Sequence, residues 1–249
     1  MTDKPSVIRE TDDEARGLAR RLLRSARYVA LAVIDPQTHF PSVSRVLLGT
    51  DTDGAAVILV SALSAHTKAL EADQRVSLLA GEPGKGDPLA HPRLTLQCVA
   101  EPVDRASASH DRLRSRFIAR HPKAKLYIDF PDFRFFRLVP QSASLNGGFG
   151  RAYLLPGEDF RIAPEPTGDF SGRELELLQD LGSTKPELAP QVAIERCGQK
   201  PGKWAFCGLD RAGVDLISGD LLVRYDFGHL IGSKAELYSE FSNTAYPIP

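Results

Sequence analysis

The chain is poor in cysteine and has no long hydrophobic run. Only three of its 249 residues are cysteines, far apart and without a CxxC pair: Cys98, Cys197 and Cys207. Such a set disfavours a disulfide framework or a structural zinc site, and it fits a reducing compartment. The longest apolar runs, 29–34 and 55–60, are too short to cross a bilayer. The acidic N-terminal segment has no signal-peptide stretch, so we expect a cytoplasmic protein with no membrane partner.

A surplus of positive charge is also missing. The sequence has 31 Lys and Arg residues against 32 Asp and Glu residues, a formal net charge of −1. A general nucleic-acid binder needs excess cations to displace the counterions of phosphates. We therefore expect no nucleic-acid partner. The balance still allows a local basic pocket for one small anion.

Short strands with few helices between them dominate the first part of the chain. Periodicity and turn residues predict strands at 28–34, 42–48, 55–61, 75–80 and 93–103, and helices at 65–72 and 107–120. A first helix is predicted from a capping box, Thr11 with Glu14. Too few helices separate the strands for a doubly wound parallel sheet. The pattern indicates an α+β protein with an antiparallel barrel and helices on its rim.

A second region follows a boundary near 156–168. A capping box of Ser171 with Glu174 predicts a helix there, and Ser233 with Glu236 predicts a last one. Between them, strands at 204–209, 214–217 and 221–227 are expected to form an antiparallel meander. We therefore expect two domains, 1–158 and 165–249.

The most informative segment for chemistry runs from Ser61 to Lys68. A strand ends at Ser61, and polar residues then occupy the turn and the helix start, where free N–H groups suit a phosphate. They are Ser64, His66, Thr67 and Lys68. An ordinary N-cap followed by solvated side chains is the alternative, and spacing alone favours it.

Three arginine-containing features add to this picture. Strand alternation places Arg45 on a face with Val43 and Leu47, so a half-buried Arg45 is expected to pair with a ligand anion or with an internal carboxylate. Arg151 follows a glycine-rich stretch, 146–150, without nucleotide-binding spacing, and it could face a ligand or cap a carbonyl. A row of arginines on the first helix reads most simply as solvated surface: Arg16, Arg20, Arg21 and Arg24.

No catalytic motif stands out among the remaining polar residues. The six histidines are scattered without an HExxH pattern, and no GxSxG elbow is present. Asp129 and Asp132 flank a proline among aromatics, where structural capping is the favoured role. If the protein is an enzyme, its chemistry is expected to come from a cofactor.

Taken together, several segments resemble the FMN-binding split-barrel superfamily related to pyridoxamine 5′-phosphate oxidase, and especially its haem-utilisation branch. They are PSVSRVLL (41–48), LVSALSAHTKAL (59–70), PRLTLQC (92–98), RHPKAKLYIDFPDFRFFRL (120–138) and LNGGFGRAYLL (145–155). The likeness covers about residues 12–155. Residues 208–227 resemble the small α/β domain that follows the barrel in that branch. The resemblance implies a six-stranded antiparallel split barrel with flanking helices, and then this small domain.

The resemblance also implies a cofactor and a partner. It implies a homodimer with ligand sites at the subunit interface and a small-molecule substrate. Residues matching Arg45, Ser61, His66, Thr67 and Lys68 would hold an FMN phosphate, with the flavin ring along Ser44 to Val46. This raises the phosphate interpretation of 61–68 above the alternative.

For the haem-degrading members, the resemblance implies haem contacts by Arg151 and, more loosely, by His229 as an iron ligand. Relatives usually carry a histidine-bearing helix near the start of the tail domain. Residues 171–191 of this chain contain no histidine, which puts a haem role of that domain in doubt.

The leading expectation is therefore an FMN-dependent oxidoreductase. The alternatives are a haem-binding or haem-degrading protein on the same barrel, and a cofactor-free regulatory protein that keeps the barrel as a scaffold. The visible spectrum of the protein with FMN or haemin would discriminate among them.

Overall fold

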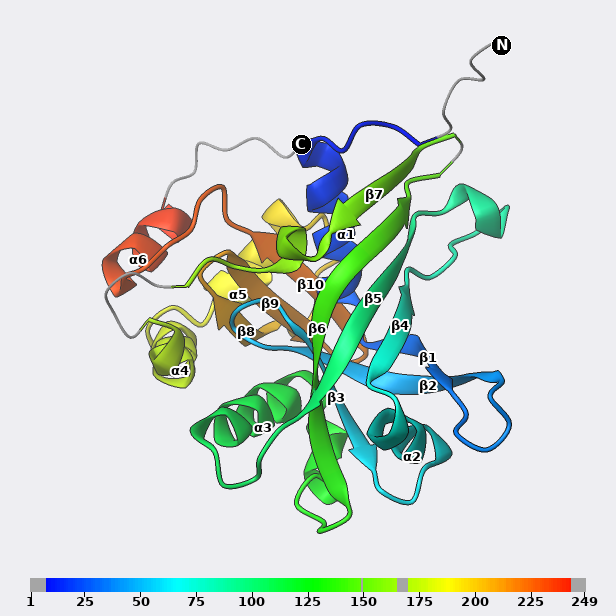
Figure 1. Cartoon of the computed structure of the whole chain (residues 1–249). Helices are drawn as coiled ribbons and strands as arrows, with labels where there is room; N and C mark the ends of the chain where they lie inside the picture. The colour runs from blue at the N-terminus through cyan, green and yellow to red at the C-terminus, as the bar shows by residue number, and fades with distance from the viewer. Residues whose placement is uncertain (1–7, 149, 165–169, 243–249) are drawn as a thin grey trace.

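The computed structural model describes residues 8–148, 150–164 and 170–242. Seven strands form one antiparallel sheet in the order β3-β2-β1-β4-β5-β6-β7 (Figure 1). Their bounds are β1 Tyr28–Ile34, β2 Pro41–Thr50, β3 Ala56–Ser61, β4 Arg75–Ala80, β5 Arg93–Pro102, β6 Phe133–Asn146 and β7 Ala152–Pro156. An additional pairing of β3 with β6 closes the first six strands into a barrel. The predicted antiparallel six-stranded barrel with flanking helices is confirmed.

The long strand β6 belongs to two parts of the sheet. Its first half, Phe133–Leu138, pairs with β3, and its second half, Ser142–Asn146, pairs with β7. Strand β5 pairs with β6 along both halves, with a register shift between Gln97 and Cys98. Such a bulge bends a strand and increases its twist, so β6 can leave the barrel and continue into a second pairing.

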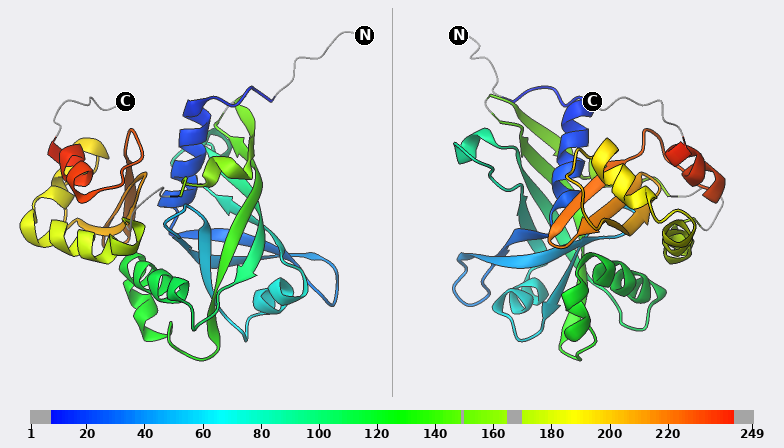
Figure 2. Two further views of the ribbon diagram at one scale, coloured as in Figure 1. Left: turned by 60° about the vertical axis from the view of Figure 1, so that its left-hand side comes forward. Right: turned by 180° about the vertical axis from the view of Figure 1, so that it is seen from behind.

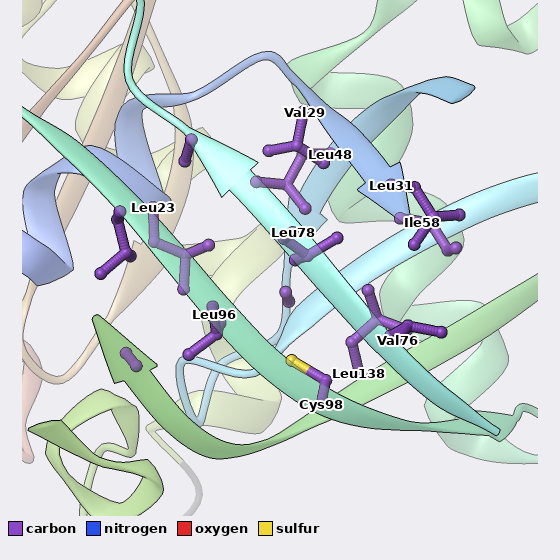
Figure 3. Close-up of a cluster of buried hydrophobic side chains, with 14 of the residues drawn as sticks. Leu23, Val29, Leu31, Leu48, Ile58, Val76, Leu78, Leu96, Cys98 and Leu138 are labelled. Carbon is purple, nitrogen blue, oxygen red and sulfur yellow. The ribbon is translucent and has the colours of Figure 1, made fainter. Parts of the chain in front are cut away.

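Apolar side chains from every barrel strand fill the interior (Figure 3). Leu31, Ile58 and Leu96 are almost completely inaccessible to solvent and lie in this cluster. Helix α1, Asp13–Ser25, closes one end by inserting Leu23 and two alanines into the same cluster. Alanines at this contact let the helix approach the strands closely, which explains the apolar spacing in the sequence.

Two further helices lie on the barrel surface. Helix α2, Ala65–Ala72, connects β3 to β4, and α3, Ala108–Arg120, follows β5. Phe117 of α3 packs so closely on β2 that a side chain at Gly49 would meet its ring at 2.9 Å. Short helical turns complete this half of the chain: η1 Pro88–Ala90, η2 Pro122–Leu126 and η3 Gly157–Phe160.

The second sheet has the order β10-β9-β8 and is the predicted antiparallel meander (Figure 2). The strands are β8 Ala205–Asp210, β9 Gly213–Ser218 and β10 Leu221–Asp226. Its helices are η4 Ser171–Arg173, α4 Glu174–Thr184, α5 Leu188–Gln191, η5 Val192–Arg196 (a π-helical turn) and α6 Lys234–Ser242. Their apolar faces cover the sheet in a separate core cluster.

One of the three predicted capping boxes forms in part, since the Glu236 carboxylate accepts from the Gly232 N–H rather than from that of Ser233. At α6, the Ser233 hydroxyl accepts a hydrogen bond from the Glu236 N–H at 3.1 Å. At α1, Asp12 is the N-cap and accepts from the Ala15 N–H at 2.8 Å, because the Thr11 hydroxyl instead donates to the Leu154 carbonyl of β7.

The predicted box at α4 is wrong, because the Glu174 carboxylate is buried and used elsewhere. It accepts hydrogen bonds from Arg116 of α3 and from the Leu209 N–H of β8, the latter at 2.8 Å. Burial raises the pKa of this carboxyl, with Arg116 acting in the opposite direction. A spacing that looks local in the sequence therefore serves a contact between the barrel helices and the second sheet.

Buried arginines and carboxylates fill the joint between the two sheets. Arg116 also donates to the carbonyls of Thr50 and Leu209, each at 2.8 Å. Arg120 donates to the Ala26 carbonyl at 2.7 Å and lies 3.3 Å from the Asp215 carboxylate. Both guanidinium groups therefore bridge the barrel side and the small sheet through charged and main-chain partners.

The arginine row on α1 is not simply a solvated surface, contrary to the sequence interpretation. Arg24 is 3 % exposed at the joint, and Arg16 pairs with Asp159 at 3.2 Å. Arg20 donates to the Asp159 carbonyl. Only Arg21 of the four is classed as exposed. The periodicity of α1 predicted a polar face, but it could not predict that the second sheet packs against that face.

Candidate functional site

The predicted phosphate segment lies where β3 ends and α2 begins, at the lower end of the barrel in Figure 1. Ser64 occupies the N-cap position of α2, and its side chain makes no capping hydrogen bond. The helix has the predicted bounds. The structure therefore brings Ser61, His66, Thr67 and Lys68 into one turn and helix start, as the sequence indicates.

Two of the hydroxyl groups at this turn are already engaged within the protein. The Ser61 hydroxyl donates to the Asp132 carboxylate at 2.6 Å and accepts from the Leu63 N–H at 3.2 Å. The buried Thr67 hydroxyl donates to the Ser61 carbonyl at 2.7 Å. An anion placed at Ser61 would meet the Asp132 carboxylate, and like charges repel at this distance. This arrangement fits a phosphate poorly.

The Ser64 hydroxyl, His66 and Lys68 are left to contact a ligand at this end of the barrel. Lys68 is exposed, and His66 is partly buried. Burial lowers the pKa of His66, which favours the neutral ring. One hydroxyl, a neutral imidazole and one ammonium group offer less to a phosphate dianion than the five residues expected.

The β2 segment places its residues on the predicted faces, but Arg45 is exposed rather than half-buried. Its guanidinium lies over the Tyr28 ring, 5.0 Å from the ring centre. Val46 points into the barrel and is buried, while Ser44 is partly buried. No carboxylate among the described residues forms an ion pair with Arg45, and the cation–π contact takes that place.

Arg151 and His229 lie outside this end of the barrel. The Arg151 guanidinium donates to the Gly147 carbonyl at 2.9 Å. Of the two roles expected for Arg151, this is the capping of a carbonyl. The positive φ of Gly148 and of Gly150 shows why glycine is needed in this turn. His229 is exposed in the loop after β10, beside α1 rather than beside α2.

Sequence reasoning missed a pocket of about 650 Å³ in the barrel wall, where β1 ends and β4 begins. It is lined mainly by apolar and small side chains, with a few polar ones at its rim. The lining residues are Ala32, Val33, Ile34, Pro41, Arg75, Val76, Ser77, Gln97, Cys98, Val99 and Gln141. The pocket is formed by residues of several neighbouring strands that are far apart in the sequence. No local motif could therefore predict it.

The pocket supplies a hydrophobic wall and little acid–base chemistry. Burial raises the pKa of the Cys98 thiol to about 12, so it stays protonated near neutral pH. Arg75 is held by Asp73 in a bidentate pair, with Nη2 2.6 Å from the carboxylate. Its lining includes no histidine, and among the described residues no three metal-ligating side chains gather into a metal site.

None of the described helices has the length and apolar character needed to span a bilayer.

Curated relatives carry names from haem chemistry. The chain is 34 % identical over 119 residues to "Non-canonical heme oxygenase HOZ, chloroplastic" of Arabidopsis thaliana, covering 48 % of this chain and 36 % of that protein. The chain thus matches only about a third of the plant protein's length. It is 31 % identical over 135 residues to "Heme oxygenase HutZ" of Vibrio cholerae, covering 52 % of this chain and 74 % of that protein.

Solved structures match over nearly the whole chain. A protein of unknown function from Agrobacterium tumefaciens, Atu2129, has a TM-score of 0.82 with 28 % identity and covers 93 % of this chain and 95 % of its own. A haem-binding protein from Mycobacterium smegmatis has a TM-score of 0.55 with 26 % identity and covers 97 % of this chain and 96 % of its own. The model of the family described as "CREG, beta-barrel" matches residues 10–161. The chain therefore belongs to the CREG β-barrel family.

Proposed function

We propose that this protein binds haem and acts in haem degradation. The observation that carries the proposal is the agreement of three relatives named for haem, one of them similar along nearly the whole chain. The expectation of an FMN-dependent oxidoreductase has no comparable support. The Ser61–Asp132 contact also argues against a phosphate at the expected place.

The wall pocket is the described feature that best suits a flat apolar macrocycle. Its volume of about 650 Å³ and its small and apolar lining suit such a group. The Arg75 guanidinium at its rim suits a propionate, provided that it exchanges Asp73 for the ligand. Because no histidine lines it and His229 lies beside α1, the proposal takes the iron ligand from a residue of a second copy.

A homodimer would bring such a second copy. Cross-strand register places outward-facing residues of five strands in two adjacent rows, Val43–Ala32–Ser77–Gln97–Ser142 and Arg45–Ala30–Leu79–Thr95–Ser144. Only one of these ten side chains, Arg45, is charged. Val43 is 67 % exposed and Leu79 is 46 % exposed on this face. A surface of mainly small, apolar and hydroxyl side chains is typical of an interface core, where charged residues are depleted. We therefore propose that this face pairs with its copy over the wall pocket, whose lining includes Ala32, Ser77 and Gln97 of the first row.

Titration with haemin tests the proposed function. We expect a Soret band that saturates with added haemin, and loss of that band when a reductant and dioxygen are supplied. Ser77→Trp fills the pocket and should weaken haemin binding. Ser115→Trp, an exposed position on α3, is the matched control and should bind like the wild type.

Other outcomes would favour the alternatives. Flavin absorbance after incubation with FMN, together with an unchanged haemin spectrum, would restore the oxidoreductase expectation. If the protein takes up neither cofactor, the cofactor-free regulatory protein remains as the hypothesis. A search for protein partners would then test it. A Soret band that resists reductant and dioxygen would keep haem binding and remove degradation.

A further inference from the structure

A second cavity lies between α1 and the loop that follows β10. Figure 2 shows α1 away from α2 and the predicted phosphate turn. The volume of the cavity is about 340 Å³, within the range of small-molecule sites. Cationic side chains come from α1, and a histidine comes from the loop. The residues that matter are Arg20, Arg21, Arg24, Asp226 and His229.

Arg24 provides the main evidence that this cavity binds a ligand. Its side chain is 4 % exposed, yet none of the described residues accepts a hydrogen bond from its guanidinium. The nearest carboxylate oxygen, of Asp226, is 3.8 Å away. That carboxylate is already bound at 2.7 Å by the Nε of Arg224. A buried cation without hydrogen-bond acceptors is costly unless a ligand supplies them.

The electrostatics around Arg24 also favours binding of an anion at this place. Burial lowers the pKa of Arg24 to about 10, with the Arg224 charge adding to the effect, and the neighbouring aspartates only partly oppose it. Arg20 uses its Nε on the Asp159 carbonyl, which leaves its terminal nitrogens available. Arg21 has no hydrogen-bond or ion-pair partner among the described residues. Three arginines therefore line the cavity, and Asp226, its one acidic lining residue, is already held by Arg224.

The loop adds main-chain donors. Within the described part of the chain, the N–H groups of Gly228, His229 and Leu230 have no hydrogen-bond acceptor, whereas those of Phe227 and Ile231 on either side are bonded. These three residues line the same cavity as α1, so their N–H groups are open to a ligand or to water.

We propose that this cavity binds a small anion carrying phosphate or carboxylate groups. Guanidinium groups bind both chemistries in bidentate geometry. The ligand completes the hydrogen bonding of Arg24 and links the barrel helix to the small sheet. The site is independent of haem, because it is built from α1 and the loop after β10 and shares no lining residue with the wall pocket.

Calorimetric titration with two probes tests the site, in a buffer free of phosphate and carboxylate. Inorganic pyrophosphate represents the phosphate source and citrate the carboxylate source, and the tighter probe identifies the ligand class. We expect binding that weakens with salt. Arg21→Gln should weaken the tighter probe about tenfold, because it removes one charge-assisted contact. This variant suits the test because Arg21 is exposed and holds nothing else in place, whereas replacing Arg24 disturbs the joint.

The matched control is Arg105→Gln, at an exposed arginine before α3, which should bind the probe like the wild type. Amide NMR gives a second measurement. Saturation with the tighter probe should shift the signals of Gly228 and Leu230 and leave those of α2 unchanged. Absence of binding by both probes, equal loss in both variants, or no effect of Arg21→Gln would each overturn the proposal.

Discussion

At the scale of single residues, the contact between Arg116 and Glu174 decides how the two sheets are joined. Both side chains are almost fully buried, and each also bonds the main chain at Leu209. A buried ion pair contributes little net energy while it is complete, but it is costly when one partner is removed. The pair therefore acts mainly to hold one arrangement of the sheets.

Glu174→Gln should lower the free energy of unfolding by about 3 kcal/mol, since it removes the carboxylate that pairs directly with the buried Arg116 guanidinium. Urea denaturation of both proteins measures the difference. Glu176→Gln on the same helix is the control, because that carboxylate pairs with Arg173 at the surface, and its stability should stay close to that of the wild type. Equal stability of all three proteins would contradict the assigned role of Glu174.

His121 makes stability depend on pH. Its Nε2 lies 2.8 Å from the Leu48 carbonyl, and burial lowers its pKa to about 4 from 6.5. Between these two values the unfolded chain binds the proton and the folded chain does not. Stability should therefore fall as the pH falls below about 6.5, by up to about 1.4 kcal/mol per unit and about 3 kcal/mol in total.

Urea denaturation between about pH 7 and pH 5 measures this slope. His121→Gln removes the titrating ring and should flatten it. A residual slope of the same sign is expected from His66, whose pKa is also lowered by burial. A slope that is unchanged in the variant would exclude His121 as its source.

At the scale of elements, the strand and helix positions were largely predictable, whereas contacts between distant elements were not. Strands β1 and β4 and helix α2 have the predicted bounds, because turn residues and periodicity are local signals. Glu174 and the α1 arginines were misread because their partners are far away in the sequence. The turn at Ser61 was located correctly. Its contact with Asp132 was not predictable, because Asp132 lies just before β6, 71 positions later in the sequence.

Two glycines provide matched tests at this scale. A side chain on Gly157 would lie 2.2 Å from the Pro140 carbonyl oxygen, so Gly157→Ala should push η3 away from β6 and destabilise the protein. Gly182 lies inside α4 with no neighbour within 4 Å. Gly182→Ala should therefore stabilise the protein by about 0.5–1 kcal/mol. Thermal unfolding compares the two, and opposite signs are expected.

At the scale of the whole molecule, the barrel face proposed for dimerisation should control the mass in solution. Leu79→Glu places a charge in the middle of that face without disturbing the core, since Leu79 is 46 % exposed. Light scattering should give a dimer for the wild type and a monomer for this variant. Leu126→Glu, at a 77 % exposed position outside the face, should remain a dimer. A monomeric wild type would remove the proposed interface.

The use of main-chain carbonyls at the joint has a consequence for divergence among relatives. Arg116 and Arg120 bind the carbonyl oxygens of residues 26, 50 and 209, which any amino acid supplies. Selection can therefore let the side chains at these three positions drift. Positions 116 and 120, in contrast, are expected to vary only together with the acidic residues 174 and 215. Across the family, residues 116, 120, 174 and 215 should therefore change together, while the residues around them change independently.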